Sequence, residues 1–192
     1  MAIELNTKAI RGLTRFALPA DDGYIYRLGV ALYGFASLSS FMAELAHHMD
    51  PLVNRTVLQA RTGGEILSEF RKSIKKAKVT KPAVWPIGRA AADMFQALNT
   101  RRSDIMHAYP ITNQAKQQIL HRRLDDKNRC FEVTNEILEE FISKLHDVSN
   151  LLYEIRAIIK PEIGDQVPTA PSIRSEKSTD LLGSTSASDQ FR

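Results

Sequence analysis

The sequence has a single cysteine, Cys130, so no disulfide can form within the chain. That cysteine usage fits a reducing compartment, and we expect a cytoplasmic protein. Residues 1–16 contain no apolar core of signal-peptide length, so no secretion signal is expected. The charge-free stretch from Leu28 to Ala43 is shorter than the roughly 20 apolar residues that span a bilayer. We therefore expect no membrane partner.

Several chemical signatures are also missing. The chain has no glycine-rich phosphate loop, no pair of cysteines, no two histidines spaced four apart for a metal-binding helix, and no Gly-x-Ser-x-Gly elbow. These absences remove most common classes of enzyme. We expect neither a metal nor a cofactor.

Positive charge is concentrated in the first 160 residues. The chain carries a net charge of +4, and because residues 161–192 carry −2, the remainder carries +6. A basic body favours an anionic partner such as RNA, although a solvated basic surface is the simpler interpretation. Residues 161–192 are rich in Ser, Thr, Pro and Gly with few aromatics, which predicts a disordered tail.

Apolar residues recur at helical spacing in four segments. They predict helices over 24–48, 64–78, 87–106 and 135–160, with Thr134 as the N-cap of the last. Residues 117–134 predict a short β-hairpin around a polar turn at 125–128. The fold class is thus all-α, a helical bundle over residues 24–160 that follows an N-terminal extension of residues 1–23.

Two groups of basic residues could contact RNA. Lys72 and Lys76 lie on the polar side of the second predicted helix, and Arg122 and Arg123 lie in the predicted hairpin. Rows of this kind are more often a solvated face, so both interpretations stay open.

The segment from Arg101 to Pro110 combines two arginines, a histidine and a proline at the predicted end of a helix. Pro110 has no N–H and biases Tyr109 away from helical backbone, which predicts that the helix ends near Met106–Ala108. On a continuous helix, residues five apart point about 140° away from each other. Arg102 and His107 can therefore converge only if the helix breaks at His107. The alternative is that the arginines are surface or salt-bridge residues and that His107 is a cation at a helix C-terminus.

The run Arg102-Ser103-Asp104-Ile105-Met106-His107 resembles the signature of HEPN domains, a superfamily of helical bundles. Nuclease members of that superfamily carry an arginine, a polar residue, three arbitrary residues and a histidine. RNA-targeting toxins among them often add a tyrosine two residues later, where this chain has Tyr109. Ser103 is a less usual polar residue than Asn, Asp or His, and the predicted hairpin is an insertion that many compact members lack.

The resemblance implies a metal-independent endoribonuclease, a toxin or a phage-defence effector, with a composite site in a homodimer. His107 would be the acid or base and Arg102 the phosphate stabiliser, supported by Arg101, Asp104 and Tyr109. Two-fold symmetry would supply the two histidines that RNA cleavage needs. In some such systems a nucleotidyltransferase antitoxin modifies the motif tyrosine.

Two other functions remain open. One is a non-catalytic HEPN-like bundle that binds nucleotide, RNA or protein. The other is an unrelated helical interaction module that binds a partner through its last helix.

Overall fold

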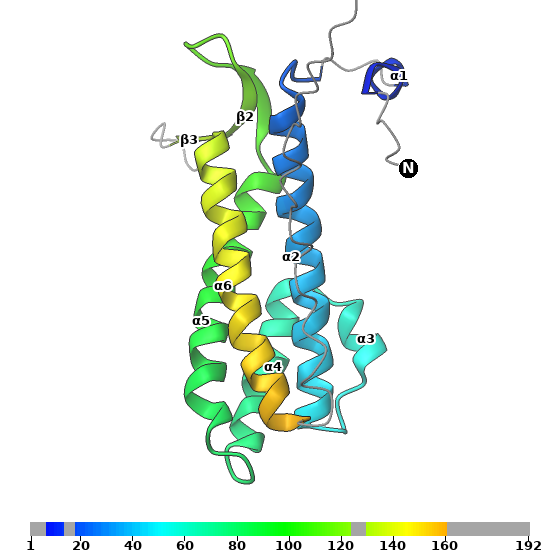
Figure 1. Ribbon diagram of the computed structural model, residues 1–192, viewed down its shortest axis with the longest axis vertical. Helices are drawn as coiled ribbons and strands as arrows, with labels where there is room; N and C mark the ends of the chain where they lie inside the picture. Colours follow the sequence, from blue (N-terminus) through cyan, green and yellow to red (C-terminus); the bar gives the residue numbers. More distant parts are fainter. Residues whose placement is uncertain (1–6, 14–17, 124–129, 161–192) are drawn as a thin grey trace, which may run out of the picture.

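The computed structural model describes residues 7–13, 18–123 and 130–160, and this part of the chain is mainly helical (Figure 1). Four long helices are present: α2 (Asp22–Met49), α4 (Gly63–Ala77), α5 (Val84–Met106) and α6 (Asn135–Ile159). Two short helices, α1 (Thr7–Gly12) and α3 (Arg55–Gln59), were not predicted. The predicted tail and the predicted turn at 125–128 lie outside the described residues.

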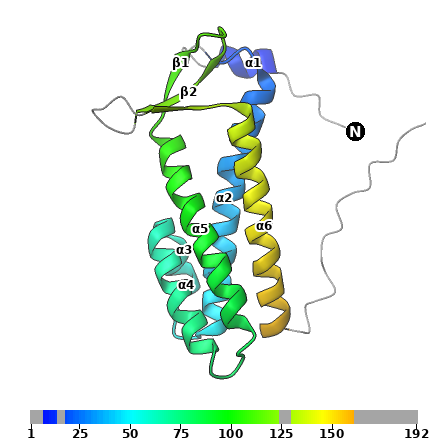
Figure 2. The ribbon, with the colours of Figure 1, turned by 90° about the vertical axis from the view of Figure 1, so that its left-hand side faces the viewer.

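The four long helices bury the apolar faces that their periodicity predicts. α2 packs against α4 and α6, and α5 packs against the same two helices (Figures 1 and 2). Burial of the apolar stripe, rather than helix propensity, supplies most of the stability of such a bundle. The stripe of α6 is fully inside the core: Leu138, Phe141, Leu145, Val148, Leu152 and Ile155.

A three-stranded antiparallel sheet caps one end of the bundle, where we predicted only a two-stranded hairpin (Figure 2). Its strands β1 (Tyr109–Thr112), β2 (Gln118–Arg123) and β3 (Cys130–Val133) are arranged in the order β1-β2-β3. The prediction missed β1 because Pro110 cannot donate to a strand ladder. Proline is tolerated on an edge strand, and β1 is one.

Side-chain caps explain where three of the helices begin. Thr134 accepts from the Ile137 amide at 3.4 Å, which confirms the predicted N-cap of α6. Asp21 accepts from the Tyr24 amide at 3.1 Å, and this bond keeps the pKa of Asp21 below its usual range. Thr62 and Glu65 form a capping box at the start of α4. The helix predicted over 24–48 therefore begins at Asp22, as α2, inside the segment predicted as an extension.

Among the described helices, α2 is long and apolar enough to cross a membrane when judged by length and composition alone. Core helices of soluble proteins pass the same test. Nine of its residues, from Tyr24 to Ala46, are buried in this fold, and α2 contacts both α4 and α6. We interpret α2 as a central helix of the bundle.

Candidate functional site

The end of α5 places His107 on the surface. α5 ends at Met106, and His107 follows as its C-cap with φ −99° and ψ 6°. The His107 amide still donates to the Ser103 carbonyl at 3.1 Å, so the last turn holds its position while its imidazole is exposed. The predicted end of the helix is confirmed.

Arg122 of β2 connects the sheet to this helix end. The Arg122 Nη1 donates to the His107 carbonyl at 3.4 Å, and its Nε lies 3.7 Å from the Asp104 carboxylate. Asp104 and Arg122 are both partly buried, at 24% and 32% side-chain exposure, so their attraction is screened less than at an open surface. Arg122, which was predicted to contact RNA, lies between the helix and the sheet with its side chain still partly exposed.

Tyr109 lies on the edge strand, directly opposite His121 of β2. The two ring centroids are 5.4 Å apart, and Tyr109 is 48% exposed. The Nδ1 atom of His121 is buried and has no hydrogen-bond partner among the described residues. Sequence reasoning missed His121. Strand alternation in 118–123 could have indicated its face, but its position beside Tyr109 follows only from the register with β1.

The two arginines of the motif face different sides of α5. The guanidinium of Arg101 lies 4.9 Å from the ring centroid of Phe131 in β3, and Arg101 lines a small pocket with residues of α6. The guanidinium of Arg102 lies 5.7 Å from the ring centroid of Phe35 in α2. Consecutive helical residues are about 100° apart, which accounts for the separation. Both arginines are exposed.

Arg102 and His107 do not line one cleft within a single chain. Arg102 borders a cleft between α2, α4 and α5 together with Ser103 and Met106, and His107 is not part of its lining. Both side chains are nevertheless exposed near the same end of α5. One protomer therefore presents both groups on its surface near the end of α5, with His107 outside the cleft that Arg102 lines.

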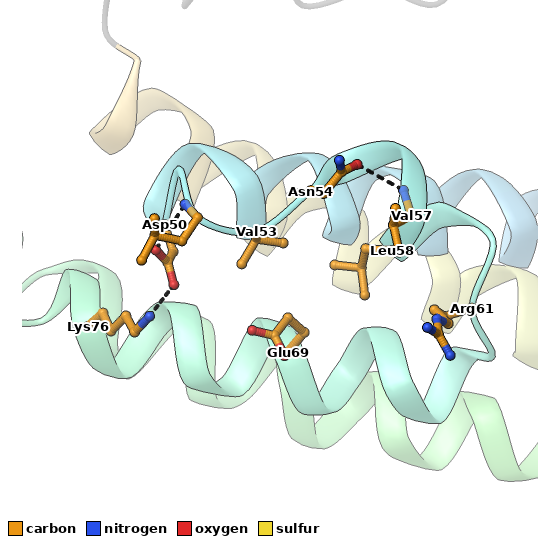
Figure 3. A pocket seen from close by; sticks show the side chains of 9 residues that line it. Asp50, Val53, Asn54, Val57, Leu58, Arg61, Glu69 and Lys76 are labelled. Atoms are coloured by element: carbon orange, nitrogen blue, oxygen red, sulfur yellow. Dashed lines mark hydrogen bonds and ion pairs between the residues drawn. The ribbon is translucent and has the colours of Figure 1, made fainter.

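Lys72 and Lys76 lie away from the motif. Gly63 is the first residue of α4, and the two lysines lie nine and thirteen residues after it, or about 14 and 20 Å along the helix at the usual helical rise. Lys72 forms an ion pair with Glu69 at 2.9 Å, and Lys76 forms one with the buried Asp50. Figure 3 shows Lys76 and Asp50 at one end of a pocket of about 310 Å³ under α3. Both lysine side chains remain more than half exposed, and Arg123 is exposed in β2, so their contact with RNA stays a prediction.

The helix–sheet junction offers groups for acid–base chemistry and for binding an anion. Exposed imidazole, phenol and guanidinium groups occur within the segment 101–109. Among the described residues, no group of three or more His, Cys, Asp or Glu side chains is placed to hold a metal ion. Comparisons of the chain with known protein families, with curated proteins and with solved structures found no match.

Proposed function

We propose that the chain is a metal-independent endoribonuclease of the HEPN type that acts in the cytoplasm as a toxin or phage-defence effector. The observation that carries the proposal is the presentation of His107. Its backbone is held by the last turn of α5 and by Arg122, while its imidazole is exposed five residues after the exposed Arg102.

The proposed reaction needs three groups at the scissile phosphate. A base removes the proton from the 2′-hydroxyl, an acid protonates the leaving 5′-oxygen, and a cation stabilises the phosphorane between them. An imidazole titrates near neutral pH and can fill either proton role. Arg102 is the phosphate stabiliser. Among the described residues its guanidinium forms no ion pair, so it is available to a substrate.

A second histidine would come from a second copy of the chain. Within the described residues, His107 does not line the cleft of Arg102, so one protomer does not bring these two groups into that cleft. A two-fold dimer that apposes the two α5 ends would place two copies of His107 and of Arg102 around one phosphate. Asp104 supports the site by holding Arg122 against the His107 turn. Tyr109, at 48% exposure, is accessible to a modifying nucleotidyltransferase partner.

The test is cleavage of a structured RNA pool in the presence of a chelator. Wild type is expected to cleave and to leave 2′,3′-cyclic phosphate ends. Arg102→Ala and His107→Ala should each lower the rate by about 100-fold or more, since each removes a group from the transition state. The matched controls Arg89→Ala, on the same helix, and His146→Ala, exposed on α6, should cleave like wild type.

Equal cleavage by all five proteins would refute the assignment of Arg102 and His107 as catalytic residues, and an inactive wild type would refute the nuclease itself. The chain would then be the non-catalytic alternative, a HEPN-like bundle that binds RNA, a nucleotide or a protein.

A further inference from the structure

A cleft of about 760 Å³ lies between α2, the α3–α4 connection and the last turns of α5. Its volume is within the range of roughly 300–1,000 Å³ that is typical of small-molecule sites. It opens next to Arg102 but extends well beyond the motif. Its lining includes polar side chains from three parts of the chain: Ser39, Ser40, Gln59, Arg61, Thr62, Asn99, Arg102 and Ser103.

The charge of this cleft is positive. Two of its lining residues, Arg61 and Arg102, carry guanidinium groups, and none carries a carboxylate. Arg102 stacks over Phe35 without an ion pair among the described residues. Arg61 pairs with Glu65 at 3.3 Å, and both side chains of that pair are at least half exposed. An exposed pair of this kind contributes little, so a phosphate can compete for Arg61.

Uncharged donors and acceptors line the same cleft as the two arginines. The Gln59 amide donates to the Ser40 hydroxyl at 2.7 Å, which links α3 to α2 across the cleft. Because Ser40 accepts in that bond, its own proton remains available to a ligand, as does the Gln59 carbonyl oxygen. Donor and acceptor side by side suit the edge of a nucleobase.

The cleft also has apolar lining residues, and α4 and α5 are closely packed beside it. Leu32 and Met106 supply its accessible apolar side chains, whereas Phe35 and Ile66 line it at only 6% and 3% exposure. Gly63 packs so closely on α5 that an added Cβ would lie 2.4 Å from the Asn99 side-chain oxygen. That contact holds the start of α4 against α5. A flat ring could therefore rest on a preformed apolar surface without a large rearrangement.

The N-terminus of α4 is already satisfied by a side chain of its own first turn. The Glu65 carboxylate already accepts from the Thr62 amide at 2.9 Å and from the Thr62 hydroxyl at 2.8 Å. The first turn of α4 is thus occupied by its own carboxylate.

We propose that this cleft binds one nucleotide of single-stranded RNA adjacent to the scissile phosphate. Arg61 and Arg102 contact the phosphates on either side of that nucleotide, its base rests on the apolar surface, and Ser40 and Gln59 contact the base edge. This inference rests on the proposed function and adds Arg61, Ser40 and Gln59 to the substrate-binding residues.

A filling substitution at Gly64 tests the cleft directly. Gly64 lines the cleft, and a Cβ there would meet only the Thr62 hydroxyl, at 4.0 Å, so Gly64→Leu adds a bulky side chain at the cleft wall without a clash at Cβ. Ser68→Leu adds the same side chain one turn further along α4, at an exposed position that does not line the cleft. The probe is a fluorescein-labelled single-stranded 12-mer RNA with 2′-O-methyl groups, which binds without being cleaved.

We expect Gly64→Leu to raise the Kd of this probe at least about 10-fold, since it displaces a stacked base. Arg61→Gln should raise the Kd by roughly 3- to 10-fold and reduce the slope of log Kd against log salt by about 0.7, the share of one phosphate contact. Ser68→Leu and Arg89→Gln should bind like wild type. Circular dichroism should give the same helical signal for each variant as for wild type, as a control for folding.

Failure of the cleft and failure of the nuclease give different results. If wild type cleaves RNA while Gly64→Leu and Arg61→Gln bind and cleave normally, the cleft proposal is wrong and the nuclease stands. If Gly64→Leu weakens binding of the probe but wild type does not cleave RNA, the cleft binds RNA and the proposed nuclease activity is wrong. A wild type that does not bind the probe overturns the cleft proposal.

Discussion

Tyr24 joins the helical bundle to the sheet through one buried hydroxyl group. The hydroxyl donates to the Val133 carbonyl at 3.0 Å and accepts from the Leu120 amide at 2.9 Å. The side chain is only 2% exposed, and burial raises the pKa of Tyr24. Tyr24 therefore satisfies polar backbone groups of β2 and β3 from the first turn of α2.

Tyr24→Phe should lower the free energy of unfolding by about 1–3 kcal/mol, because it leaves those two backbone groups without a partner. Urea unfolding measures the loss, and Tyr26→Phe, at a position that is 73% exposed, is the matched control. An unchanged midpoint in Tyr24→Phe would show that the hydroxyl is dispensable. Because the pKa of Tyr24 is raised when folded, its contribution is complete below the ordinary value of 10.0 and is lost as the pH rises above it.

At the candidate site, the sequence predicts where the helix that carries the motif ends, but not the neighbours of the site residues. Pro110 indicates where α5 ends, and this end places Arg102 inside the helix and His107 just after it. The different directions of Arg101 and Arg102, about 100° apart, follow from helical geometry, but their aromatic neighbours do not. Nor do the positions of His121 and Arg122. Their neighbours depend on the register of a sheet whose edge strand has only four residues.

At the scale of elements, helices and sheet differ in how much the sequence reveals. Each long helix buries a stripe over at least four turns, so many residues repeat the same signal. The sheet has strands of four to six residues, and β2 carries two arginines and a histidine. Alternation over so few residues is weak, and tertiary contacts with α2 and α5 decide the outcome.

Lys81, from the connection between α4 and α5, caps the C-terminus of α6. Its Nζ donates to the carbonyls of Ile159 at 2.8 Å and of Ile158 at 3.2 Å. The last carbonyls of a helix lack intrahelical partners and carry partial negative charge, so an ammonium group there is stabilising.

Lys81→Met should reduce the free energy of unfolding by about 1 kcal/mol, since it keeps most of the side-chain volume but removes the charged donor. Thermal or urea unfolding measures this change. Lys75→Met, at an exposed position on α4, provides the control and should unfold like wild type. Equal losses in the two variants would mean that general surface charge, and not the cap, is responsible.

At the scale of the whole molecule, the candidate residues gather at the sheet end of the bundle. The lysines of α4 that were predicted to contact RNA lie toward the other end, engaged with Glu69 and Asp50. An anionic substrate would therefore be recognised by the sheet end and by the cleft beside Arg102. This arrangement concentrates the proposed chemistry on a surface that two copies of the chain can share around a two-fold axis.

With a composite site, the rate of RNA cleavage depends on the square of the fraction of protomers that carry an intact His107. If both copies of His107 are needed, mixed dimers of wild type with His107→Ala are inactive. After subunit exchange, an equal mixture should then retain about one quarter of the activity of the same total amount of wild type. Random pairing in an equal mixture makes about one quarter of the dimers fully wild type, because both protomers of such a dimer must be intact.

The control mixture pairs wild type with His146→Ala, whose exposed histidine on α6 is outside the site, and it should retain full activity. Exchange is followed with two affinity tags, so that mixed dimers are counted directly. Activity of one half in the His107→Ala mixture would contradict the composite site. Each protomer would then cleave alone, and a second proton-transfer group would have to come from the same chain. His121, with its buried Nδ1 and its ring beside Tyr109, would be the residue to replace next.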